Sequence, residues 1–174
     1  MHCYNITSCG DIMIEANNAF NSQHNHQHCI SSALKSAKQL CKARGQRLTP
    51  IRELVLRLVW QSHKPLGAYE LLPSLAEAGF NSAPPTIYRA LDFLQELGLI
   101  HRIASMNAFI GCTNPDHPHP SGFMICKVCK TAAELDTSEL NSAFESVAKR
   151  IGFAIQDETV ELVGLCQQCQ EQEA

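Results

Sequence analysis

Four cysteines stand in two closely spaced pairs in the second half of the chain. Cys126 and Cys129 form one Cys-X-X-Cys motif, and Cys166 and Cys169 form another after 36 intervening residues. Two such pairs supply the four thiolates of a tetrahedral zinc site that leaves no position open for a substrate. Redox-active or metal-free thiols are the alternatives, but redox chemistry needs only one pair. The spacing therefore predicts a structural zinc ion that ties the last strand to an earlier one.

Further metal-binding side chains lie around the first pair, and the closed cysteine site does not need them. They are His101, Cys112, His119 and Glu134, which together offer the imidazole, thiolate and carboxylate groups that suit zinc. Each also has an ordinary interpretation, as a polar strand histidine, a small buried cysteine, a linker histidine and an exposed strand carboxylate. Spacing alone leaves both interpretations open. His117, close to His119, has no assigned role.

The composition indicates an intracellular protein. Nine cysteines in 174 residues is a high count, but the tight pairs favour metal binding in a reducing compartment over a secreted disulfide framework. The first thirty residues lack the basic start and apolar run of a signal peptide, and no apolar stretch is long enough to span a membrane. We expect a cytoplasmic protein with no membrane contact.

Charge divides the chain into two halves. Residues 30–104 contain ten Lys and Arg against five Asp and Glu, whereas residues 105–174 contain four against ten. A basic half joined to an acidic half predicts that the first half meets a polyanion and the second does not. Double-stranded DNA is the leading candidate.

Apolar residues at helical spacing predict four helices after a polar start. Residues 1–30 are rich in Asn, Ser, Gln and His, so we expect a disordered extension. Its HNHQHC run is either a loose metal-binding segment or an ordinary polar tail. The four helices are expected to begin at Ser31, Pro50, Tyr69 and Ser82, with Ser82 as the N-cap of the fourth. Gly45, Gly79 and Gly98 are expected to end the first, third and fourth of them.

Two short strands are expected next, over residues 99–105 and 107–112. Helices followed by a small hairpin describe a winged helix-turn-helix, in which the fourth helix reads DNA. On that helix Pro85, Tyr88 and Arg89 face away from the apolar stripe, and Arg89 can pair with a guanine edge or a phosphate. A solvated face with a half-buried ring is the other interpretation. Contacts with the DNA backbone are expected from Lys42 and Arg47.

The segment 112–122 contains three prolines and no apolar period, so we expect an extended linker there. Beyond it the pattern predicts strands over 122–126 and 131–135, a helix over 136–150 closed by Gly152, and a third strand over 153–163. The predicted fold class is α+β. The predicted domains are an extension at 1–30, a winged-helix DNA-binding domain at 31–110, a hinge at 111–121, and a dimerisation and metal-binding domain at 122–174.

From Arg47 to Cys169 the chain resembles the ferric uptake regulator family and, within it, the branch of zinc uptake regulators. The resemblance rests on RLTPIRELVLRLV, PPTIYRALDFLQELGLIHRI, the cysteine of FIGC, HPSGFMICKVCKTAAEL and VELVGLCQQC. Iron-sensing relatives usually carry an HHDH-like run where this chain has DHPHPSG. They also tend to have a histidine in the last strand, where this chain has Gln-Asp-Glu at 156–158. With a thiolate at Cys112, these departures favour zinc over iron.

The resemblance implies a homodimeric, zinc-responsive repressor of zinc-uptake genes that binds palindromic DNA. It implies two zinc ions per chain, a structural one on the four paired cysteines and a regulatory one on His101, Cys112, His119 and Glu134. The regulatory ion would fix the hinge between the two domains. An iron- or other metal-sensing regulator of the same family is the alternative, followed by a zinc storage or chaperone protein.

A zinc enzyme fits the sequence poorly. No HExxH or HxE spacing occurs, and a site with four protein ligands has no position for a reacting water. We therefore expect a regulator and not an enzyme.

Overall fold

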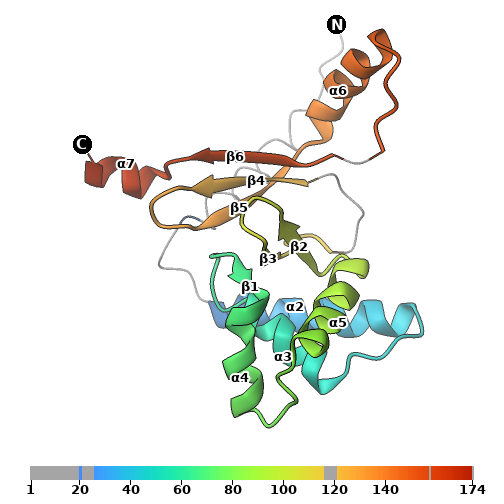
Figure 1. Cartoon of the computed structure of the whole chain (residues 1–174), viewed down its shortest axis with the longest axis vertical. Coiled ribbons are helices and arrows are strands. Elements are labelled where there is room, and N and C mark those ends of the chain that lie inside the picture. The colour runs from blue at the N-terminus through green and yellow to red at the C-terminus, as the bar shows by residue number, and fades with distance from the viewer. Residues whose placement is uncertain (1–19, 21–25, 116–120, 157, 174) are drawn as a thin grey trace, which may run out of the picture. The chain divides into compact units, whose positions relative to one another are not determined.

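The computed structural model describes residue 20 and residues 26–115, 121–156 and 158–173 (Figure 1). The fold is α+β, as predicted. The chain divides into one compact unit within residues 25–119 and a second within residues 1–24 and 120–174. Among the described residues, no helix combines the length and the apolar character that crossing a bilayer requires.

The first unit contains the predicted helices, which differ from expectation mainly at their starts. Thr49 is the N-cap of the second helix and Pro50 its first residue, as expected. The N-cap of the fourth helix is Ala83, so the prediction of Ser82 was wrong. Proline fits the first turn there because those N–H groups have no helical partner. The helical elements are α2 (His26–Ala43), α3 (Pro50–Val59), the 3-10 turn η1 (Ala68–Leu71), α4 (Leu72–Glu77) and α5 (Pro84–Glu96).

Helix α2 begins at His26, before the predicted start at Ser31, so residues 26–30 do not belong to a disordered extension. Ile30 is buried in the core of this unit, which explains why the helix extends through a polar sequence. At the other end Gly45 adopts a positive φ of 62°, and Gly79 and Gly98 after the later helices adopt positive φ angles of 78° and 72°. These glycines end the helices as predicted.

A small antiparallel sheet, whose hairpin follows α5, completes a winged helix-turn-helix. Strands β2 (Ile100–Ile103) and β3 (Ala108–Gly111) form the predicted hairpin. The two-residue strand β1 (Leu66–Gly67), which was not predicted, pairs with the other edge of β3, giving the order β1-β3-β2.

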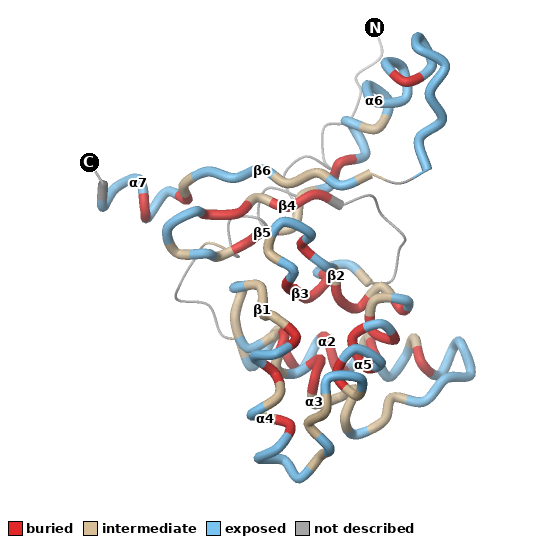
Figure 2. Tube along the Cα trace, in the orientation of Figure 1, coloured by how far each residue is buried: buried red, intermediate tan, exposed pale blue. Residues whose placement is uncertain are grey.

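The core of this unit lies between the helices and the sheet, where Figure 2 shows the buried segments. Each fully buried aliphatic side chain contributes about 1.5–3 kcal/mol of transfer free energy. This core holds α5 in place with one face turned outward. Its fully buried members include Val55, Leu56, Leu71, Leu75, Ile87, Leu91 and Leu94.

The second unit is a three-stranded sheet with two helices. Strand β4 pairs antiparallel with β5 and parallel with β6, so the order is β5-β4-β6 (Figure 1). The third strand is shorter than the predicted 153–163, and the last helix was not predicted. The elements are β4 (Ser121–Cys126), β5 (Ala132–Asp136), α6 (Ser138–Arg150), β6 (Val160–Gly164) and α7 (Gln167–Glu173).

Candidate metal centres and nucleic-acid interface

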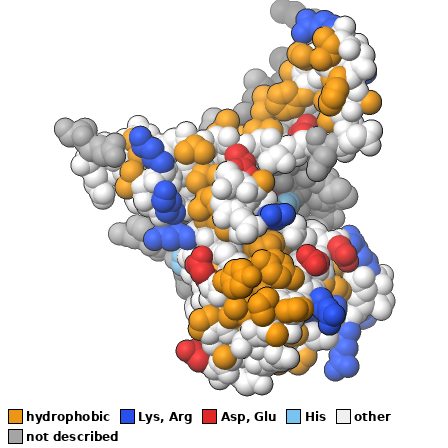
Figure 3. All heavy atoms as spheres, viewed as in Figure 1, with side chains coloured by type: hydrophobic (Ala, Val, Ile, Leu, Met, Phe, Trp, Pro, Cys, Tyr) orange, Lys and Arg blue, Asp and Glu red, His pale blue; other side chains and the backbone are white. Residues whose placement is uncertain are grey.

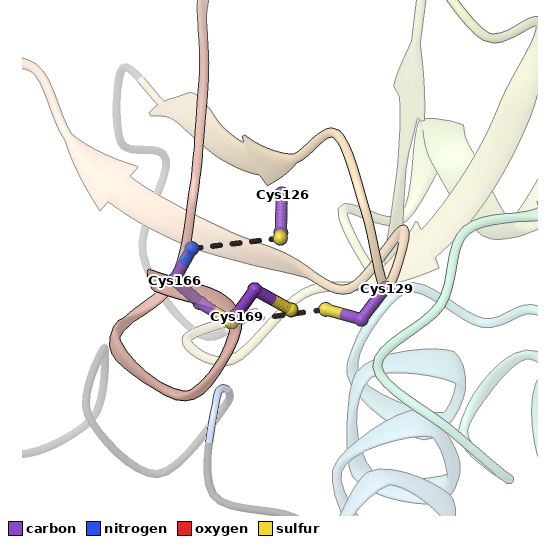
Figure 4. Close-up of side chains that lie close together, drawn as sticks. All are labelled: Cys126, Cys129, Cys166 and Cys169. Carbon is purple, nitrogen blue, oxygen red and sulfur yellow. Dashed lines mark hydrogen bonds between the residues drawn. The ribbon is translucent and has the colours of Figure 1, made fainter. Parts of the chain in front are cut away.

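The parallel pairing of β4 with β6 brings the two Cys-X-X-Cys motifs together. Cys126 ends β4 opposite Gly164 of β6, and Cys129 follows in a tight turn closed by a 3.0 Å bond from the Lys130 N–H to the Cys126 carbonyl. Cys166 follows β6, and Cys169 lies in α7. Figure 4 shows the four side chains gathered at this end of the sheet.

The sulfur positions match a tetrahedral zinc site. One ligand atom from each of the four cysteines lies within 4.8 Å of all the others, and the Sγ atoms of Cys129 and Cys166 are 3.8 Å apart. A zinc–thiolate bond of about 2.3 Å in a tetrahedron places its sulfurs about 3.8 Å from each other. All four residues are free cysteines, and three of them are buried. The predicted structural ligands are therefore assembled.

The pKa values of these thiols reflect how closely the four sulfurs are packed. Burial raises the pKa of Cys126, but hydrogen bonds from the backbone N–H groups of Cys166, Cys129 and Val128 outweigh it, so the pKa falls to about 6. Burial and the neighbouring cysteines raise the pKa of Cys169 to about 12. Without a cation, four thiolates in so small a space would repel one another. A divalent ion would compensate that charge.

Two of the predicted regulatory ligands meet in the winged-helix unit. His101 lies on β2 opposite Ile110 of β3, and Cys112 follows β3, with its N–H donating to the Leu99 carbonyl at 3.0 Å. Side chains alternate along a strand, so His101 and Cys112 project from the same face of the hairpin. A ring nitrogen of His101 and the Cys112 Sγ lie within 4.8 Å of each other. Cys112 is only 2% exposed.

Of the other two predicted regulatory ligands, only Glu134 is among the described residues, and it lies in the second unit. Glu134 is half-buried on β5, where it pairs with Phe123 of β4. His119, like His117, lies outside the described residues. The structure therefore brings His101 and Cys112 together and places Glu134 in the second unit.

Helix α5 presents the predicted DNA-reading side chains to solvent. Ile87, Ala90 and Leu91 are buried, whereas Pro85 and Arg89 are exposed and Tyr88 is 37% exposed. An exposed helix face with a guanidinium and a phenol can enter a major groove.

The two basic residues predicted to contact the DNA backbone lie on the surface of this unit. The sequence did not indicate that two neighbouring arginines pack against the protein instead. Lys42 and Arg47 are exposed. Arg44 donates to the Glu96 carbonyl at the end of α5 at 3.1 Å. Arg52 lies 3.4 Å from the centre of the Phe93 ring and donates to the Arg47 carbonyl at 2.7 Å. These contacts hold the segment around Arg47 against α5.

Comparison with known proteins gives consistent matches over most of the chain. The model of the ferric uptake regulator family matches residues 43–163. The zinc uptake regulation protein of Escherichia coli is 39% identical over 142 residues, which cover 81% of this chain and 83% of that protein.

Solved structures give the same result. A zinc uptake regulator complexed with zinc and DNA superposes with a TM-score of 0.76 at 36% identity, covering 87% of this chain and 99% of that one. The crystal structure of holo XcZur superposes with a TM-score of 0.73 at 44% identity, covering 82% and 99%.

Proposed function

Because the chain belongs to the ferric uptake regulator family, we infer that it is a zinc-responsive, sequence-specific DNA-binding repressor of zinc-uptake genes. The observation that carries this inference is the similarity, over 87% of the chain, to a zinc uptake regulator complexed with zinc and DNA. The relatives are regulators, and we propose no catalytic activity for this chain. As a DNA-binding repressor it acts in the cytoplasm.

Two zinc ions per chain have different tasks. The first is held by Cys126, Cys129, Cys166 and Cys169 and is structural, because it joins the ends of β4 and β6 in a unit with a small core. The sulfur spacing of 3.8 Å supports this assignment. Removing this ion should affect the folding of the second unit more than the response of DNA binding to zinc.

The second ion is the switch. We assign it to His101, Cys112, His119 and Glu134, which supply the mixed nitrogen, sulfur and oxygen ligands that zinc accepts. The proximity of His101 and Cys112 supports the assignment. In the sequence His101 precedes the linker, Cys112 stands at its start and His119 lies within it. Glu134 follows it. An ion bound by all four would restrict the hinge and fix the separation of two reading helices to match a palindrome.

Apolar side chains on the second unit support a homodimer. Figure 3 shows apolar side chains gathered over α6. A groove of about 430 Å³ runs beside its C-terminal half and the segment that follows. Ile151 and Phe153 are 75% and 63% exposed, values that a second copy would reduce. Other exposed apolar residues of this unit include Leu140, Phe144, Val147, Ile155, Leu162 and Val163.

Phe153→Asp should convert the dimer into a monomer at low micromolar concentration. The substitution places a charge in an apolar interface and removes an aromatic contact. The lost contact is worth about 2 kcal/mol or more, equivalent to roughly a thirty-fold rise in the dimer dissociation constant. Sedimentation equilibrium measures this change. Tyr69→Asp is the matched control, since Tyr69 is 65% exposed in the other unit. An unchanged dimer in Phe153→Asp would contradict the placement of the interface.

Arg89→Ala should weaken specific DNA binding by about 1–3 kcal/mol, because it removes a contact to a base edge or a phosphate. The measurement is fluorescence anisotropy of labelled DNA at saturating zinc and fixed salt. Arg150→Ala, in the acidic half of the chain, removes the same charge without touching α5. Equal losses from both variants would indicate a general charge effect and contradict the assignment of α5 as the reading helix.

The function itself is tested by selecting binding sites from random duplex DNA. The full chain should enrich a palindromic sequence at buffered free zinc and enrich none after removal of the exchangeable ion. Bound and unbound zinc can be counted in the same samples. Enrichment that is identical with and without the exchangeable zinc would disprove a zinc-dependent repressor.

A further inference from the structure

The single tryptophan of the sequence lies against the residue that precedes Cys112. Trp60 follows α3 as its C-cap, is half-buried and packs on the core of the winged-helix unit. Its indole covers Gly111, the last residue of β3. A Cβ added at Gly111 would come to 2.6 Å from Cζ2 of Trp60 and closer still to Cε2. The backbone of Gly111 therefore approaches the ring more closely than any other residue type would allow.

The alternation of side chains along β3 links this contact to the proposed regulatory site. Gly111 pairs with Ile100, and both face the helices. Cys112 faces the opposite side, the side that His101 shares. The Trp60 ring thus packs against one face of β3 at Gly111. The thiol of the next residue, Cys112, lies on the other face.

The indole is held in this place by packing. Its Nε1 is buried and has no hydrogen-bond partner among the residues that the structure describes. A buried N–H without a partner is unfavourable, so a residue that only filled space would be better as an aliphatic side chain. The broad ring against Gly111 is the contact that distinguishes tryptophan from those alternatives.

We propose that Trp60 and Gly111 form a positioning pair for the regulatory zinc site, in which the indole fixes the backbone before Cys112 and so fixes the thiol relative to His101. The proposal rests on the proposed function, because it takes Cys112 and His101 as zinc ligands. Metal–ligand distances are tolerant to only about 0.2 Å. A shift of the β3 end by a few tenths of an ångström is therefore enough to weaken the site.

The test is a double-mutant cycle on the full-length dimer with Gly111→Ala and Trp60→Leu. Affinity for the exchangeable zinc is measured by competition with a fluorescent chelator after the structural zinc has been counted. Gly111→Ala should weaken this affinity about ten-fold or more, as changes around metal ligands do. In the Trp60→Leu background the same change should cost far less, because the ring that obstructs the added methyl group is gone.

Gly164→Ala is the matched control, because a Cβ at that strand position meets no heavy atom within 4 Å. It should leave the affinity for the exchangeable zinc unchanged. An equal cost of Gly111→Ala in both backgrounds, or no cost in either, would overturn the pairing.

A second measurement uses Trp60 as the probe and needs no change at Gly111. Its emission should shift as the exchangeable zinc binds and should stay constant in Cys112→Ser. This decides the proposal if Gly111→Ala does not fold, since constant emission in the wild type overturns it. If the wild type binds no exchangeable zinc, or binds it equally in Cys112→Ser, the regulatory site itself is wrong. If Cys112 is required but the cycle shows no coupling, only the role of Trp60 fails.

Discussion

Cys112→Ser should abolish the zinc dependence of DNA binding while the protein remains a folded dimer with its structural zinc. The substitution removes the only thiolate of the proposed regulatory site and replaces it with a hydroxyl that binds zinc poorly. Without the ion the hinge is not restricted. The affinity for DNA then falls in proportion to the fraction of time that the dimer spends in the binding-competent arrangement. Typical coupling free energies predict a loss on the order of a hundred-fold at zinc concentrations that saturate the wild type.

Anisotropy of labelled operator DNA across buffered free zinc measures this effect directly. Cys41→Ser is the matched control, because it makes the same chemical change at a cysteine of α2 that is as buried as Cys112 and belongs to neither proposed zinc site. Zinc counting should give two ions per chain in the control and one in Cys112→Ser. If Cys112→Ser retained the wild-type response to zinc, the proposed switch would be disproved.

Cys129→Ser should have a different and more severe effect, because it acts on the fold of the second unit. Structural zinc sites contribute about 10–16 kcal/mol of apparent binding free energy in small zinc-dependent domains, which exceeds the usual stability of a domain. With one thiolate missing, most of this is lost and three buried thiols remain without their ion. We expect loss of the dimer and of cooperative unfolding for this unit.

Thermal unfolding followed by circular dichroism, together with sedimentation, measures that loss. Val128→Ser is the matched control, since Val128 is in the same turn but is 49% exposed and offers no ligand. It should keep two zinc ions per chain and the wild-type transition. A stable Cys129→Ser dimer that still responds to zinc would remove the structural assignment.

Much of the architecture could be predicted from the sequence, because helix ends and apolar spacing are local properties. Gly79 and Gly98 end helices where the pattern predicted, and the hairpin after α5 forms from the two expected strands. The start of α2 was missed because its first turn is polar. Of residues 26–30, Ile30 alone is buried in the core. Strand β1 is a two-residue element that exists through pairing with β3, so no local pattern indicates it.

Around the proposed metal sites, too, some features could be predicted from the sequence and others could not. The clustering of the four paired cysteines could be predicted because their chemical type and spacing together suggest one site, and the parallel register of β4 and β6 brings them together. The contact of Trp60 with Gly111 could not be predicted, since the two residues are far apart in sequence and no local pattern connects them. Such contacts depend on how α3 packs against β3, which only the folded chain defines.

The parallel pairing of β4 with β6 also predicts an order of folding. The helices and hairpin of the winged-helix unit connect neighbours in sequence, so their loops close quickly. The two cysteine motifs are separated in the chain by β5, α6 and β6, so bringing them together closes a longer loop. We therefore expect zinc binding at this site to follow the folding of the winged-helix unit. Before zinc binds, an oxidant could convert each Cys-X-X-Cys pair into a disulfide, so we expect assembly of this site to require both zinc and a reducing environment.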